Sequence, residues 1–170
     1  VERVLRVLDC AVLVISAVEG VQAHTEALWG ALQSMKIPTI LFINKIDRIG
    51  ADVELVTEEI KKDLTDQLAI FQETEHEGSN DANINTIWNE ENVNEKMVET
   101  IANANETILE KYLEEESLSF IELDKALVKA VHQCDLYPVL MGSAKNTVGV
   151  EELLDAVVHY FPDSDFDVNK

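Results

Sequence analysis

The sequence is poor in basic residues. It holds 13 lysine and arginine residues against 33 aspartate and glutamate residues, which gives a formal net charge of −20 over 170 residues. Such a negative field repels the phosphates of nucleic acids and the headgroups of anionic lipids. We therefore expect neither direct DNA binding nor membrane binding by this chain.

Cysteine is scarce as well, with Cys10 and Cys134 as the two examples. Each lies in or beside an apolar run, and neither has a second cysteine or a metal-ligand spacing nearby. We expect both to be buried, reduced thiols rather than a disulfide, because free cysteines are among the most buried residues. Since disulfides are rare in the cytoplasm, reduced thiols favour a cytoplasmic protein, and the spacing favours one without a metal site.

Long apolar runs are missing too. No run approaches the roughly 20 residues that a membrane-spanning helix needs, and no segment resembles a signal peptide. Residue 1 is a valine within the helical pattern "VERVLRVLD", where a native start would normally be a methionine. We interpret the chain as a piece of a longer protein.

Hydrophobic residues nevertheless make up 46% of the chain, enough for a folded domain. Short continuous apolar runs predict strands at residues 10–18, 39–44 and 137–143, and such runs are typical of parallel strands with both faces covered. Helical patterns lie between and beyond them, at about residues 24–35, 52–68, 94–115, 120–133 and 149–161. This alternation predicts an α/β fold with a doubly wound, mainly parallel sheet.

The acidic residues are concentrated in the middle of the chain. Residues 48–140 hold 22 acidic and seven basic residues, so this segment carries −15 of the total −20. Within it, residues 73–92 are rich in Glu, Asn, Asp, Gly and Ser, which predicts a surface loop or a loosely held excursion. We expect the exposed glutamates to be solvated faces of the molecule.

Two polar clusters follow predicted strands. In doubly wound sheets, ligands bind beyond the carboxyl ends of the strands, so both clusters are candidate binding loops. The residues are Asn44, Lys45 and Asp47 after one strand, and Ser143, Ala144 and Lys145 after another.

The first cluster suits guanine. An ionised Asp47 accepts two parallel hydrogen bonds from guanine N1 and N2, whereas adenine presents an unprotonated N1 that repels a carboxylate. The methylene stem of Lys45 can lie along a flat ring while its ammonium group stays hydrated. Asn44 can tie loops together or reach the far edge of the base.

The second cluster supplies the remaining contacts of a guanine pocket. A backbone N–H near Ala144 can donate to guanine O6, Ser143 can brace the loop through its hydroxyl, and Lys145 can cover the second face of the ring. The alternative is a polar turn that closes a strand, together with a solvated Lys145. Two such loops, each after a predicted parallel strand, favour the binding interpretation.

The motifs resemble those of a known family. "NKID" with "GSAK" is similar to the fourth and fifth guanine-recognition motifs of translational GTPases, and "VLDCAVLVISAVEGVQAHTEALWGAL" resembles the segment after the second switch of elongation factor G. The combination of "GVQAHT", "IPTILFINKIDR" and "GSAKNTVGVEELLDAVVHYFP" is most similar to the tetracycline-resistance ribosomal protection proteins. The resemblance implies part of a P-loop GTPase domain, with GTP or GDP as ligand and the ribosome as partner.

The same resemblance implies how the chain is organised. Residues 1–47 are the second half of a GTPase core, 48–136 a helical acidic insertion that begins with a core-packing helix, 137–161 the last core strand and helix, and 162–170 a linker. The family carries such an extra subdomain between the two motifs, and Asp47 and Gly142 stand 95 positions apart here.

The phosphate-binding motif G-x-x-x-x-G-K-[ST] does not occur in the sequence. In the family that loop, the first-switch threonine and the D-x-x-G would lie upstream. Phosphoryl transfer depends on those parts, so we expect base recognition without catalytic residues here, and Mg²⁺ only in the full-length protein. The alternatives are a fragment of a translocase like elongation factor G, and a non-enzymatic acidic interaction module.

A GTPase sheet without its first three strands has an uncovered edge. We expect that edge to be covered by self-association, by domain swapping or by rearrangement of the amino-terminal helix.

Overall fold

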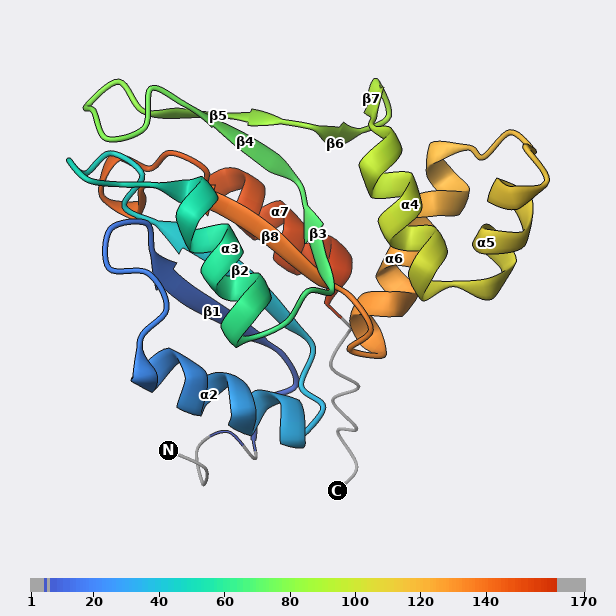
Figure 1. Ribbon diagram of the computed structural model, residues 1–170, viewed down its shortest axis with the longest axis horizontal. Helices are drawn as coiled ribbons and strands as arrows, with labels where there is room; N and C mark the ends of the chain where they lie inside the picture. Colours follow the sequence, from blue (N-terminus) through green and yellow to red (C-terminus); the bar gives the residue numbers. More distant parts are fainter. Residues whose placement is uncertain (1–4, 6, 162–170) are drawn as a thin grey trace.

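The core is a parallel four-stranded sheet (Figure 1). A computed structural model describes residue 5 and residues 7–161 of the chain. The strand order is β1 (Ala11–Ser16), β2 (Thr39–Asn44), β8 (Tyr137–Gly142) and β3 (Leu68–Ile70). The predicted α/β class and the three predicted core strands are therefore confirmed.

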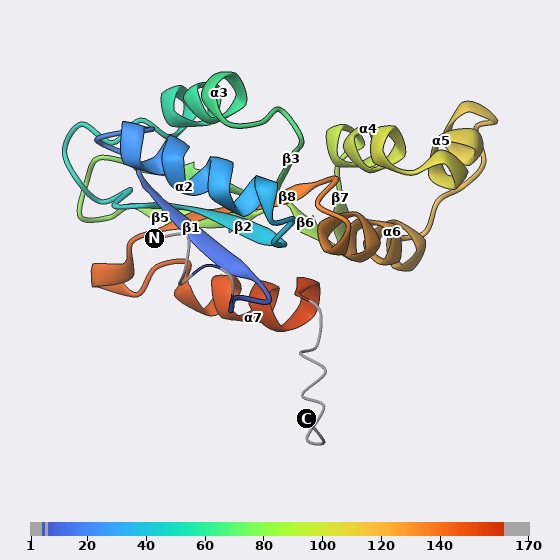
Figure 2. The same ribbon diagram turned by 90° about the horizontal axis from the view of Figure 1, so that it is seen from below.

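Helices cover both faces of this sheet (Figure 2). α2 (Ala23–Ser34) and α3 (Val53–Asp63) lie on one face, and α7 (Val150–Tyr160) lies on the other. The residues of β2 divide between the two apolar clusters: Ile40 and Phe42 join one, and Leu41 and Ile43 join the other. This two-sided burial is the reason why the core strands are continuous apolar runs.

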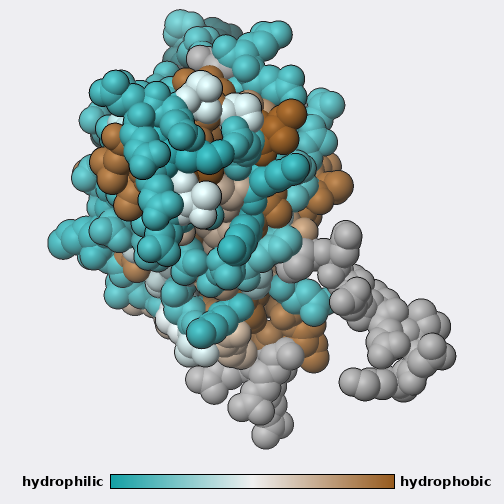
Figure 3. All heavy atoms as spheres, turned by 90° about the vertical axis from the view of Figure 1, so that its right-hand side faces the viewer, coloured by the Kyte–Doolittle hydropathy of each residue, from teal (hydrophilic) through white to brown (hydrophobic). Residues whose placement is uncertain are grey.

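The middle of the chain forms a second lobe beside the sheet. Its helices are α4 (Glu95–Ala104), α5 (Glu106–Leu113) and α6 (Phe120–His132). The face seen from this side is mainly hydrophilic, as expected for solvated acidic helices (Figure 3). The predicted helix at residues 94–115 is in fact two helices, because Asn105 adopts an extended backbone with φ −142° and caps the second helix through Ile108 N.

The insertion, which we expected to be mostly helical, also contains strands. β3 belongs to this segment and pairs in parallel with β8, and the helix predicted to continue to residue 68 ends at Asp63. The segment at residues 73–92, expected to be a surface loop or a loosely held excursion, contains strands as well. β4 (Gln72–Glu75) and β5 (Asn83–Thr86) pair antiparallel there, followed by the short pair β6 (Trp88–Asn89) and β7 (Asn92–Val93).

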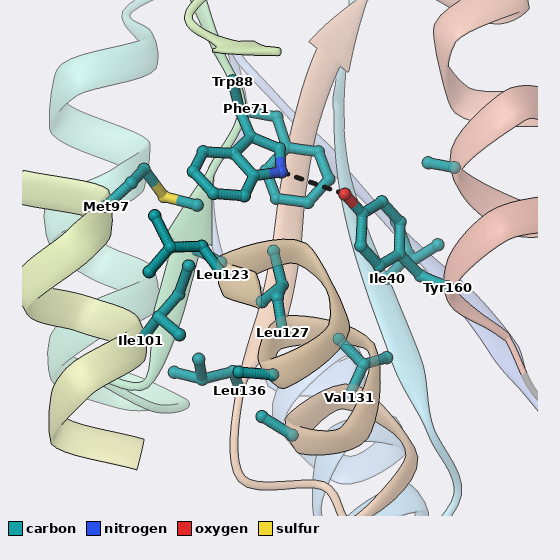
Figure 4. Packing of buried hydrophobic residues seen from close by; sticks show 14 of the residues in the cluster. Ile40, Phe71, Trp88, Met97, Ile101, Leu123, Leu127, Val131, Leu136 and Tyr160 are labelled. Atoms are coloured by element: carbon teal, nitrogen blue, oxygen red, sulfur yellow. Dashed lines mark hydrogen bonds between the residues drawn. The ribbon is translucent and has the colours of Figure 1, made fainter. Parts of the chain in front are cut away.

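Trp88 anchors these strands to the helices (Figure 4). Its ring is buried, 6.5 Å from the ring of Phe71 and 4.9 Å from that of Phe120 between centroids. Its Nε1 donates to the hydroxyl of Tyr160 on α7 at 3.0 Å. One aromatic residue therefore holds a polar segment in a fixed place.

Several expectations concern the thiols and the ends of the chain. Cys10 and Cys134 are free, as expected, but they are partly rather than fully buried, and burial raises the pKa of both thiols. The amino-terminal helical pattern lies largely, and the linker at 162–170 entirely, outside the described residues. Among the helices of the described part, none is long and apolar enough to cross a membrane.

Candidate nucleotide-binding site

The candidate site lies where three parallel strands end together. Ser16, at the end of β1, is in register with Asn44 at the end of β2, and Asn44 is in register with Gly142 at the end of β8. All three strands point the same way, so the loops that follow them emerge at one edge of the sheet. This edge is where doubly wound sheets bind ligands.

Asn44 joins the two loops that the sequence singled out. Its side-chain Oδ1 accepts hydrogen bonds from the backbone N–H of Lys45 at 2.8 Å and of Ala144 at 3.0 Å. These two donors stand 99 positions apart in the chain. One half-buried carboxamide therefore fixes the separation of the two motifs.

Lys45 has an unusual backbone and an acidic partner. Its φ is 70°, a left-handed conformation that an L-residue adopts at a cost. Its Nζ lies 3.2 Å from both carboxylate oxygens of Glu19, in the loop after β1. Glu19 was not predicted from the sequence. Its position just after a predicted strand was the one available signal, and that signal alone does not connect it with Lys45.

Asp47 follows a residue that is locked into the core. Ile46 is fully buried, and its N–H donates to the carbonyl oxygen of Gly142 at 3.2 Å, which provides a second tie between the loops. The N–H of Arg48 donates to the Lys45 carbonyl at 3.1 Å and closes a tight turn around Asp47. The Asp47 side chain is thus half-buried on a turn held at both sides.

The second loop is braced by its own residues. Ser143 is buried and is the N-cap of η1 (Ala144–Asn146). Its hydroxyl accepts from the N–H of Asn146 at 3.4 Å. Gly142 has no room for a side chain, because a Cβ there would overlap the carbonyl oxygen of Val148. The close approach of these backbones leaves Ala144 and Lys145 exposed at the tip of the loop.

The structure therefore brings all six predicted site residues to one edge of the sheet. It also shows that the Ala144 N–H, the expected donor to guanine O6, is aligned by the Asn44 carboxamide. Within the described residues, no three His, Cys, Asp or Glu side chains are placed to hold a metal ion.

Comparisons with known proteins match nearly the whole chain. Residues 1–163 match the model of the elongation factor Tu GTP binding domain. Tetracycline resistance protein TetP of Clostridium perfringens is 38% identical over 162 residues, and TetM of Ureaplasma urealyticum is 40% identical over 161 residues. Each alignment covers 95% of this chain but only 25% or 24% of the relative.

A solved structure agrees with the fold. A crystal structure of a protein from Thermus thermophilus superimposes with a TM-score of 0.82 and 26% sequence identity, over 95% of this chain and 28% of that one. The chain thus spans about a quarter of the length of the proteins that it matches.

Proposed function

Since the chain belongs to the family of elongation factor Tu GTP-binding domains, we propose that its two strand-end loops hold the guanine base of GTP and GDP. The supporting observation is the Asn44 carboxamide, which bonds to one backbone N–H in each loop. A base-binding pocket needs loops at a fixed separation, and this pair of hydrogen bonds supplies it.

Base selectivity is assigned to Asp47. Its carboxylate accepts from guanine N1–H and N2–H, and the buried neighbour Ile46 holds the turn that carries it. The stems of Lys45 and Lys145 cover the two faces of the ring. The Ala144 N–H donates to guanine O6 as a three-centre bond shared with Asn44.

The test changes which base the pocket prefers. In the full-length protein, Asp47→Asn should weaken guanine nucleotide binding and favour xanthine nucleotides, because the amide replaces one acceptor with a donor. Competition of GDP and xanthosine diphosphate against a fluorescent nucleotide measures the ratio of affinities. Asp66→Asn, an exposed residue after α3, is the matched control. An unchanged guanine preference would remove Asp47 from this role.

We further propose that the whole protein is a ribosome-associated GTPase that protects against tetracycline. The support is its likeness to tetracycline resistance proteins. GTP hydrolysis and Mg²⁺ binding are assigned to residues outside this chain, which has no phosphate-loop motif. Full-length protein should raise the tetracycline concentration that stops growth of a sensitive host, and Asp47→Asn should abolish that gain. A wild-type protein that gives no gain would favour a translocase.

Two finer proposals concern the chain itself. We propose a cytoplasmic location, which fits the free thiols of Cys10 and Cys134. We also propose self-association through β1, which pairs with β2 alone among the described strands.

A further inference from the structure

A groove of about 630 Å³ lies between the core and the insertion, away from the candidate nucleotide site. α3 and α4 form its two sides, with β3 between them (Figure 1). Its apolar floor includes Leu68 and Ile70 of β3, Met97 of α4 and Met141 of β8. The size is that of a site for a peptide segment or a small molecule.

Gln72 in the floor has an unused hydrogen-bond donor. The side chain is 1% exposed, and its Oε1 accepts from the Met141 N–H at 2.9 Å. Among the described residues its buried Nε2 has no hydrogen-bond partner, although buried polar groups are nearly always paired. Exchanging the assigned positions of the amide oxygen and nitrogen does not help, because a donor would then face the Met141 N–H. This leaves one donor for an acceptor group of a ligand.

The rim of the groove is acidic. Four glutamates and two lysines line it, which leaves a net charge of −2: Glu54, Glu58, Glu73, Glu77, Lys61 and Lys96. Glu58 is paired with Lys61 at 2.5 Å, and Glu77 accepts from Val53 N and the Thr74 hydroxyl. The exposed carboxylates of Glu54 and Glu73 remain available for a cationic ligand.

We propose that this groove binds an extended basic peptide segment. Lysine or arginine head groups pair with Glu54 and Glu73, their methylene stems lie on the apolar floor, and a backbone carbonyl of the peptide accepts from Gln72 Nε2. A peptide supplies both a cation for the carboxylates and an acceptor for Gln72 Nε2. A polyamine offers no acceptor when protonated, and an acidic peptide is repelled. Gln72 also borders a cavity of about 270 Å³ beside α7, which is too small for a peptide.

Titration with a defined peptide tests the charge complementarity. The probe is a fluorescein-labelled nonapeptide of alternating lysine and alanine, and its fluorescence anisotropy is followed as the purified chain is added. Replacing both carboxylates, as Glu54→Gln with Glu73→Gln, should raise the Kd about tenfold. The matched control, Glu114→Gln with Glu115→Gln on the exposed end of α5, removes the same charge and should change the Kd less than about twofold.

A spectroscopic readout tests the acceptor without changing a buried residue. In an amide NMR spectrum, the side-chain NH₂ signals of Gln72 should move as the peptide is added, whereas those of Gln33, which donates to the Tyr137 hydroxyl, should stay in place. Binding that is equally weakened in both double variants would reveal non-specific attraction and overturn the proposal. A stationary Gln72 signal at saturation would overturn it as well.

Discussion

At the scale of the residue, Asn44 is the side chain on which the candidate site depends most directly. Asn44→Ala removes the acceptor for the Lys45 and Ala144 N–H groups, and we expect it to lower the free energy of unfolding by about 1–2 kcal/mol. In the full-length protein, guanine nucleotide affinity should fall as well, because the loops lose their fixed separation. Urea denaturation measures the first effect and nucleotide titration the second.

The control for this change is Asn103→Ala. Asn103 is exposed on α4, where alanine is the better helix former, so the free energy of unfolding should stay the same or rise slightly. Equal losses in the two variants would show that the Asn44 contacts do not hold the loops.

At the scale of the element, the start of α6 is built from a charged cluster. Lys111 Nζ lies 2.7 Å from Glu122 Oε1, and the N–H and hydroxyl of Ser119 donate to Oε2 at 3.1 and 2.9 Å. The hydrogen bond from Lys111, followed by those from Ser119, lowers the pKa of Glu122 from 4.5 to about 2. Ser119 and Glu122 form the capping box of α6, and the ion pair of Glu122 with Lys111 links α6 to α5.

The lowered pKa predicts a pH dependence of stability. Because the folded-state pKa lies below the unfolded one, the contribution of Glu122 is present above about pH 4.5 and is lost as the pH falls toward 2. Glu122→Gln should therefore destabilise the chain at pH 7 and narrow its difference from wild type at pH 2.5. Urea midpoints at both values measure this, with the exposed Glu114→Gln as the control. A constant difference between wild type and Glu122→Gln would contradict the assignment.

The strands that sequence patterns could predict are those formed by continuous apolar runs, β1, β2 and β8. The polar residues that follow marked the ends of β2 and β8, whereas β1 ends at Ser16, two residues before its predicted end. β5 reads "NINT" and is polar, and β3 is only three residues long beside a helical pattern, so neither had a local signal. β5 forms by pairing with β4 in a hairpin, and β3 forms by pairing with β8, which is distant in the sequence.

The residues of the candidate site could be predicted from the sequence, but the contacts between them could not. The chemistry of a carboxylate, two lysines and a backbone donor identified the six residues from their types and spacing. The bond from Ala144 N to Asn44 and the pair of Lys45 with Glu19 arise only when separate strands align. Composition and spacing carry no information on such geometry.

At the scale of the whole molecule, a partly buried chain of hydrogen bonds joins the insertion to the core. Trp88 Nε1 donates to the Tyr160 hydroxyl, which donates to Asp124 Oδ1 on α6 at 2.7 Å. His159 Nε2 lies 2.6 Å from the other oxygen of the same carboxylate. Burial and the nearby Asp124 raise the pKa of Tyr160, so the phenol keeps its proton and remains the donor.

Tyr160→Phe tests this connection. The change leaves Trp88 Nε1 without its acceptor and Asp124 with one donor fewer, so we expect a loss of about 1–3 kcal/mol in the free energy of unfolding. Hydrogen exchange should accelerate in α6 more than in β2. Tyr112→Phe, whose partly exposed hydroxyl makes a 3.3 Å bond to Glu99, should cost less than about 0.5 kcal/mol. Similar losses in both variants would contradict the connection.

The outer edge of β1 predicts self-association of the chain. Among the described strands β1 pairs with β2 alone, and its Val14 is 54% exposed, while α7 exposes Leu154 and Val158. Unpaired backbone groups beside exposed apolar side chains favour pairing with a second copy of the chain. Sedimentation equilibrium of the 170-residue chain should therefore show dimers whose population rises with concentration.

Val14→Lys should convert these dimers to monomers, because a charge on an edge strand opposes pairing. Leu113→Lys is the control, because Leu113 is exposed on α5, and it should leave the dimers unchanged. A wild-type chain that stays monomeric at all concentrations would contradict the expectation.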